Sequence, residues 1–155
     1  MKRILLLVYI LSMGCSTPTV QRQPNQQESK HLRVIAITDL HGAIESEDIQ
    51  TATGQKVTIG GAALLARYIQ TLKNDGGFTT VIVDGGDLFQ GTMISNFSEG
   101  RPVIEAYNRI GVDAAALGNH DFDFGPAGPL SVPQSPNDDP RGALKERIRQ
   151  ARFPF

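Results

Sequence analysis

The chain has 155 residues and a formal net charge of −1, with 40% apolar and 20% charged residues. This composition is ordinary for one globular domain, and because lysine and arginine are scattered along the chain rather than clustered, we expect no nucleic-acid partner. A single cysteine excludes an intramolecular disulfide framework.

The first 14 residues have the features of a signal peptide. Lys2 and Arg3 precede an apolar run, residues 4–13, that is too short to span a bilayer but suits the hydrophobic region of a signal. The segment that ends at Cys15 resembles a bacterial lipobox, although Ser12 stands where such boxes have a large aliphatic residue. Either Cys15 becomes the lipidated first residue of the mature chain, or cleavage is of the ordinary secretory kind. In both cases we expect export, to the periplasm or to the membrane through a lipid anchor on Cys15.

Residues 15–31 are expected to form a flexible tether, because they are rich in Pro, Gln, Ser and Thr and offer almost nothing to bury. The folded domain is then expected over residues 32–155. It begins with a nearly continuous apolar run in residues 33–38, which is the pattern of a strand buried on both faces, and Asp39 follows that strand.

Helical and extended patterns alternate in the rest of the chain. A polar loop runs through Glu45, Glu47 and Asp48, and the apolar residues Leu65, Tyr68, Ile69 and Leu72 then have the spacing of one helix face. The later expected elements are a strand at 79–83, a helix from Pro102 to Gly111, a strand at 112–117, a loop at 126–140, a helix at 142–152 with Leu144, Ile148 and Ala151 inward, and the start of a fourth strand at 152–155. The order strand, helix, strand, helix, strand predicts an α/β fold with a mostly parallel sheet.

Metal-ligand side chains follow each of the three predicted strands. Asp39 and His41 follow the first strand, Asp87 the second and Asn119 the third. Because the carboxyl ends of parallel strands meet at one edge of a sheet, we expect these side chains to lie together. Carboxylate, imidazole and amide oxygen suit Mn²⁺, Fe²⁺ or Zn²⁺, and one carboxylate can bridge two ions about 3.5–4 Å apart. The sequence therefore predicts one two-metal hydrolytic site.

These clusters together resemble a known family. Asp39-x-His41, Gly86-Asp87 and Gly118-Asn119-His120-Asp121 look like the motifs of the calcineurin-like metallophosphoesterases. The longer sequence motif at residues 118–126, together with the segments 60–62 and 89–91, is similar to the bacterial 5'-nucleotidase and UDP-sugar hydrolase branch. The resemblance covers residues 32–155 and implies the N-terminal half of a four-layer α/β sandwich.

The resemblance also implies roles for individual residues. Asp39, His41 and Asp87 would hold the first of two divalent ions of the Mn, Zn, Fe or Co type, and Asp87 and Asn119 would hold the second. His120, paired with Asp123, would be catalytic and would stabilise the leaving oxygen as an imidazolium. The implied reaction is the release of phosphate from a nucleotide or another small phosphoester by attack of metal-bound hydroxide.

Several neighbouring residues are expected to be structural. Asp84 is expected to orient its loop, although a role as a further site carboxylate stays open, and Asp121 is expected to bind backbone amides. Phe122 and Phe124 are expected to lie in the core, and His31 at the surface.

The family completes its site with histidines from the second half of the domain, whereas this sequence has only His31, His41 and His120. We therefore expect an N-terminal fragment with an exposed apolar sheet face, weak metal binding and little or no turnover by itself. Two alternatives stay open, namely a thiosulfohydrolase with the same scaffold and a non-catalytic lipoprotein that binds a metal or a partner.

Overall fold

The structure is a computed structural model that describes residues 30–155. The predicted signal peptide, the lipidation of Cys15 and nearly all of the tether lie outside these residues, so they stay predictions. Among the helices of residues 30–155, none has both the length and the apolar character needed to cross a membrane.

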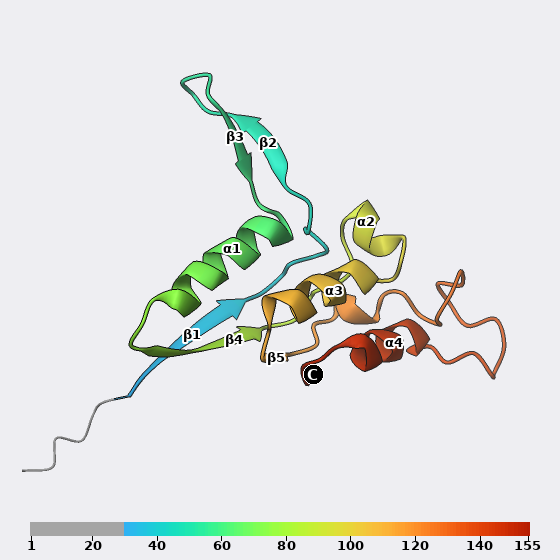
Figure 1. Cartoon of the computed structure of the whole chain (residues 1–155). Helices are drawn as coiled ribbons and strands as arrows, with labels where there is room; N and C mark the ends of the chain where they lie inside the picture. The colour runs from blue at the N-terminus through green and yellow to red at the C-terminus, as the bar shows by residue number, and fades with distance from the viewer. Residues whose placement is uncertain (1–29) are drawn as a thin grey trace, which may run out of the picture.

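The main sheet contains three parallel strands, as the α/β pattern predicts. Its order is β1 (His31–Ile37), β4 (Phe78–Asp84) and β5 (Ala114–Ala115), so that β4 lies in the centre (Figure 1). β5 is much shorter than the strand expected at 112–117. At its N-terminal end, the carboxylate of Asp113 accepts the N–H of Ile82 at 2.8 Å and takes the place of a strand carbonyl in the ladder.

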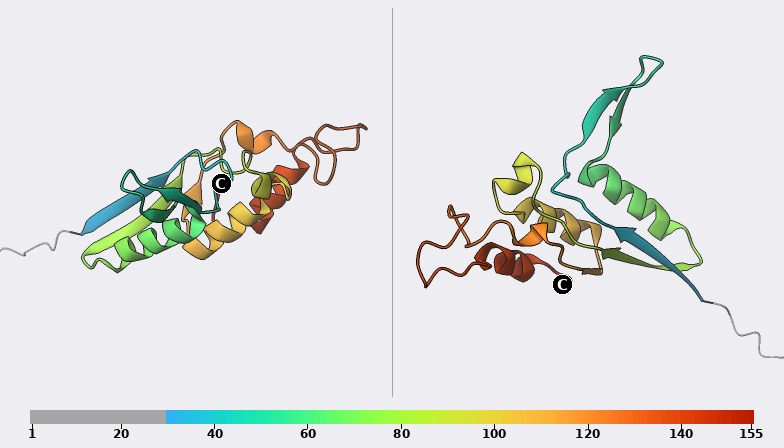
Figure 2. Two further views of the ribbon diagram at one scale, coloured as in Figure 1. Left: turned by 90° about the horizontal axis from the view of Figure 1, so that it is seen from above. Right: turned by 180° about the vertical axis from the view of Figure 1, so that it is seen from behind.

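Three helices confirm the helical patterns of the sequence: α1 (Gly61–Asn74), α3 (Arg101–Ile110) and α4 (Gly142–Gln150). Pro102 lies in the first turn of α3, and Gly111, with a left-handed φ of 78°, ends that helix. α1 and α3 both lie on one face of the main sheet (Figure 2). The chain is thus organised as one sheet layer and one helix layer.

Three features of the fold were not expected from the sequence. β2 (Glu47–Gln50) and β3 (Lys56–Ile59) form an antiparallel hairpin that projects from the body of the molecule, where the sequence predicts a polar loop (Figure 1). The short helix α2 (Met93–Asn96) is the second, and the 3-10 helix η1 (His120–Phe122) is the third. All of these elements are short, so no apolar pattern indicates them.

The fourth strand expected at 152–155 is absent from the described part of the chain. One backbone hydrogen bond forms there, from the N–H of Ala115 to the carbonyl of Pro154 at 3.0 Å. Proline has no N–H, so Pro154 can only accept a hydrogen bond from its neighbour.

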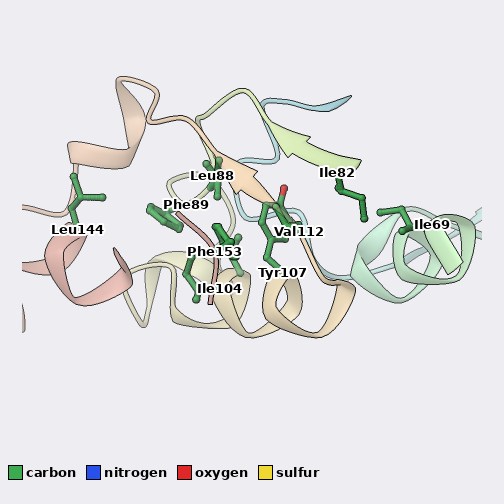
Figure 3. Packing of buried hydrophobic residues seen from close by; sticks show 11 residues of the cluster. Ile69, Ile82, Leu88, Phe89, Ile104, Tyr107, Val112, Leu144 and Phe153 are labelled. Atoms are coloured by element: carbon green, nitrogen blue, oxygen red, sulfur yellow. The ribbon is translucent and has the colours of Figure 1, made fainter. Parts of the chain in front are cut away.

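The core lies between the sheet and the helices (Figure 3). Its most completely buried large side chains are Tyr107, Phe89, Ile69, Ile82, Leu88, Ile104 and Val103. Two predicted core positions are wrong, because Phe122 is 44% and Ile148 38% exposed. Tyr68, on the predicted apolar face of α1, is 71% exposed. α4 instead buries Arg147, whose guanidinium donates to the carbonyl of Ser98 at 3.0 Å.

The opposite face of the sheet is open. Along β1, exposed residues alternate with half-buried ones, and Leu32 and Val34 are 62% and 57% exposed. The prediction that this strand is buried on both faces is therefore wrong for the described residues, because helices cover one face and nothing covers the other. The expected exposed apolar face is confirmed.

Candidate metal centre

Asp39, His41 and Asp87 come together at the carboxyl edge of the sheet. Each offers one potential ligand atom, and these atoms all lie within 4.8 Å of one another. The loops after β1 and β4 stay paired beyond the strands, because the N–H of Asp39 donates to the carbonyl of Gly86 at 3.1 Å and that of His41 to the carbonyl of Asp87 at 2.9 Å. Parallel pairing therefore carries the three side chains to one point.

All three residues have left-handed backbone conformations. Their φ angles are 53° at Asp39, 48° at His41 and 59° at Asp87, and among the described residues Glu99 is the one other non-glycine residue with positive φ. This region is unfavourable for residues with a Cβ, and such residues concentrate at functional sites. The surrounding hydrogen bonds thus hold three potential ligands in turns that the chain does not adopt freely.

A backbone carbonyl fixes the orientation of the His41 imidazole. Its Nδ1 lies 2.7 Å from the carbonyl oxygen of Gln90, and because a carbonyl only accepts hydrogen bonds, Nδ1 carries the proton. Nε2 then keeps its lone pair, 4.0 Å from Oδ1 of Asp39. A backbone carbonyl that fixes the tautomer of a histidine is a common feature around metal ligands. Two carboxylates and this imidazole fit a divalent cation.

The loop after β5 closes tightly around Asp87. The N–H of His120 donates to Oδ1 of Asp87 at 2.9 Å. A Cβ on Gly118 would lie 2.1 Å from the same oxygen, so the close approach requires glycine there. Asn119 stands between these two contacts and is exposed beside the cluster.

His120 and Asp123 form an imidazole–carboxylate pair next to the potential ligands. Nδ1 of His120 lies 2.7 Å from Oδ2 of Asp123. The ring of His120 is also 5.3 Å from that of His41, in an edge-on arrangement. The hydrogen bond to Asp123 is the main cause that raises the pKa of His120, and the charge of Asp87 acts in the same direction. The protonated imidazole is thereby favoured beside the cluster.

Two buried carboxylates lie beneath the site. Asp84 accepts the hydroxyl of Tyr107 at 2.6 Å and the N–H of Gly86 at 2.7 Å, which agrees with its expected loop-orienting role. Burial raises the pKa of the Asp84 carboxyl and that of the Tyr107 hydroxyl. The expectation that Asp121 binds backbone amides is confirmed, since the N–H of Gly118 donates to it at 2.9 Å.

A groove of about 720 Å³ opens beside Asp123. Phe124, Asn96, Phe97 and residues 127–131 contribute to its walls. The sequence predicted neither this groove nor the hydrogen bond between the Gln90 carbonyl and His41. Residue types do not indicate where a backbone carbonyl will point or where the surface will be hollow.

Comparison with known proteins matches most of the described domain. Residues 32–147 match the family described as calcineurin-like phosphoesterase. The snake venom 5'-nucleotidase of Gloydius brevicauda is 35% identical over 137 residues, which cover 82% of this chain and 23% of that protein. The trifunctional nucleotide phosphoesterase YfkN of Bacillus subtilis is 29% identical over 130 residues, covering 76% of this chain and 9% of that one. The chain thus spans less than a quarter of the length of these two curated relatives.

Solved structures agree with this match. The crystal structure of a 5'-nucleotidase precursor from Thermus thermophilus has a TM-score of 0.62 and 28% sequence identity, covering 79% of this chain and 21% of that one. The fold is therefore that of the N-terminal metallophosphoesterase domain of 5'-nucleotidases.

Proposed function

The chain belongs to the calcineurin-like phosphoesterase family, and we propose that it serves as a metal-dependent phosphoester hydrolase of the 5'-nucleotidase type. Its substrate would be a nucleotide or another small phosphoester, which is what the names of its relatives indicate for those proteins. The observation that carries the proposal is the gathering of the Asp39, His41 and Asp87 ligand atoms within 4.8 Å, with the His120–Asp123 pair beside them.

The residues would divide between two divalent ions. Asp39, His41 and Asp87 would hold one ion, and Asp87 together with Asn119 would hold the other. Bound ions of the Mn, Zn, Fe or Co type supply Lewis-acid chemistry, because they polarise phosphoryl oxygens and lower the pKa of water.

His120 would act on the departing oxygen. Because Nδ1 faces Asp123, Nε2 is the atom left to donate a proton or to stabilise negative charge. Asp123 holds the ring in place and favours its protonated form. The groove beside Asp123 leaves room for the part of the substrate that departs.

We expect the 155-residue polypeptide by itself to bind metal weakly and to release phosphate slowly. The residues named above give three ligands to the first ion and only two to the second. Zinc sites in proteins usually have three or four protein ligands, so the second ion in particular would be held weakly.

The test is Mn²⁺ binding, followed by the loss of its free-ion EPR signal, together with phosphate release from 5'-AMP. Asp87→Asn should lower Mn²⁺ affinity about tenfold or more, because it removes a ligand charge. His120→Ala keeps the backbone N–H and should leave Mn²⁺ affinity within about twofold, while it lowers any phosphate release about a hundredfold. Glu105→Gln, an exposed acid on α3, is the matched control and should change neither.

Failure of the unchanged chain to bind Mn²⁺, or equal affinity in the Asp87→Asn chain, would contradict the proposed site. Mn²⁺ binding that depends on Asp87, with phosphate release that does not depend on His120, would contradict the proposed catalytic pair and favour a metal-binding role.

A further inference from the structure

The Asp121 carboxylate lies beneath the candidate metal centre and accepts four backbone hydrogen bonds. Its Oδ1 accepts the N–H of Leu88 at 2.7 Å and that of Phe89 at 3.2 Å. Its Oδ2 accepts the N–H of Asp87 at 3.0 Å and that of Gly118 at 2.9 Å. The residue is 1% exposed, so water does not compete for these donors. One side chain thus satisfies four N–H groups that would be costly to leave unpaired in the interior.

Asp121 itself belongs to the loop after β5, so three of these four bonds join the two loops that carry the chemistry. Three donors belong to the loop after β4, which holds Asp87, and the fourth belongs to the loop after β5, which holds Asn119 and His120. One of the donors is the N–H of Asp87 itself, whose φ of 59° requires support from its surroundings. The Asp121 carboxylate therefore helps to hold these two loops at a fixed distance from each other.

We propose that Asp121 is a positioning residue, which holds Asp87 and Asn119 in the arrangement that binds metal while touching neither metal nor substrate. The inference deepens the proposed function and rests on it. It assigns to the carboxylate a task that hydrophobic packing could not perform, since the four partners are all N–H donors.

Because all four partners are donors, an asparagine side chain, which has the same shape but carries an amide, cannot replace the carboxylate of Asp121. An asparagine has one oxygen and one NH₂ group, so in either orientation the NH₂ group would face two N–H donors. Asp84 differs in this respect, because its partners are the N–H of Gly86 and the hydroxyl of Tyr107. A hydroxyl can rotate to accept a hydrogen bond from an amide. Asp84→Asn therefore keeps both of its contacts, and the two buried aspartates form a matched pair of variants.

The experiment measures Mn²⁺ affinity by EPR in the full chain and its two variants. We expect Asp121→Asn to weaken Mn²⁺ binding about 10–100-fold, the range found when groups that orient metal ligands are removed. Asp84→Asn should change the affinity by less than about twofold. In the Co²⁺-loaded chain, the visible absorption bands should shift with Asp121→Asn and stay unchanged with Asp84→Asn, because these bands report the geometry of the ligands and not the stability of the fold.

A measurement on the unchanged chain covers the case in which Asp121→Asn does not fold. If Asp121 fixes the positions of the two loops, the backbone amides of Asp87 and Gly118 should be protected from hydrogen exchange before any metal is added. Addition of Mg²⁺ should then increase this protection only slightly. Rapid exchange of both amides without metal would overturn the inference, because the metal would then be the agent that orders the loops.

The outcomes separate the two proposals. Mn²⁺ binding of equal strength in the unchanged and Asp121→Asn chains would overturn the positioning role and leave the proposed function intact. If the unchanged chain binds no Mn²⁺, the proposed function fails, and the positioning role fails with it.

Discussion

Gly118→Ala tests the close contact on which the candidate site depends. Gly118 has no left-handed φ, so alanine is allowed by the backbone at this position. The obstacle is space, since the new Cβ would lie 2.1 Å from Oδ1 of Asp87 and 2.5 Å from both its Cγ and its backbone nitrogen. Asp87 must therefore move, and it must give up the 2.9 Å hydrogen bond from the N–H of His120.

The expected cost follows from these two losses. Forcing a methyl group into a closed contact costs about 1–3 kcal/mol, and breaking a hydrogen bond to a charged group costs about 1.5–3 kcal/mol. Because one displacement of Asp87 causes both, the two costs are not additive, and we expect the free energy of unfolding to fall by about 2–4 kcal/mol. Mn²⁺ affinity should fall about tenfold or more, since a proposed metal ligand has moved.

Urea unfolding followed by circular dichroism measures the first effect, and EPR of free Mn²⁺ measures the second. Gly76→Ala is the matched control, because Gly76 also lacks a left-handed φ and a Cβ there meets nothing within 4 Å. It should change stability by less than about 1 kcal/mol. Equal effects of the two substitutions, or unchanged Mn²⁺ affinity in the Gly118→Ala chain, would refute the argument that Gly118 fits against Asp87.

Two further predictions concern the pH dependence of the site and the open face of the sheet. Asp123→Asn should lower the pKa of His120 toward its ordinary value, which an NMR titration of the metal-free chain can measure, and an unchanged pKa would contradict the pairing. Because the pKa of His120 is raised in the folded state, its stabilising effect is present below the ordinary pKa of about 6.5 and is lost as the pH rises through the folded-state value. The Asp123→Asn chain should therefore lose more thermal stability at about pH 5.5 than at about pH 9. Val34→Thr on the open face should reduce aggregation in light scattering while it changes stability by less than about 0.5 kcal/mol. The control Val103→Thr, at a fully buried position, should lower the free energy of unfolding by roughly 1–3 kcal/mol. Equal aggregation of the unchanged and Val34→Thr chains would show that the open face does not cause the aggregation.

Most of the fold could be predicted because its main elements carry local patterns. The apolar spacing in α1, Pro102 and Gly111 around α3, and the β-branched run in β4 each indicate an element without reference to the rest of the chain. The hairpin of β2 and β3 could not be predicted in this way. Its strands have four residues each and are mostly exposed, so their sequence shows no burial pattern.

Residue identity and order were enough to predict which chemical groups the candidate site contains and which strand each group follows. Asp39, His41, Asp87, Asn119 and His120 stand at strand ends, and a parallel sheet brings such ends to one edge.

How these groups are held became evident only in three dimensions. The left-handed turns at the potential ligands, the orientation of the His41 ring and three of the four hydrogen bonds of Asp121 depend on partners far away in the sequence, such as Asp87 and Asp121, which are 34 residues apart. The exposure of Val34 likewise depends on which layers cover the sheet. Local preference selects helix or strand, whereas the orientation of a side chain in a site is set by hydrogen bonds and packing between distant segments, which no local pattern encodes.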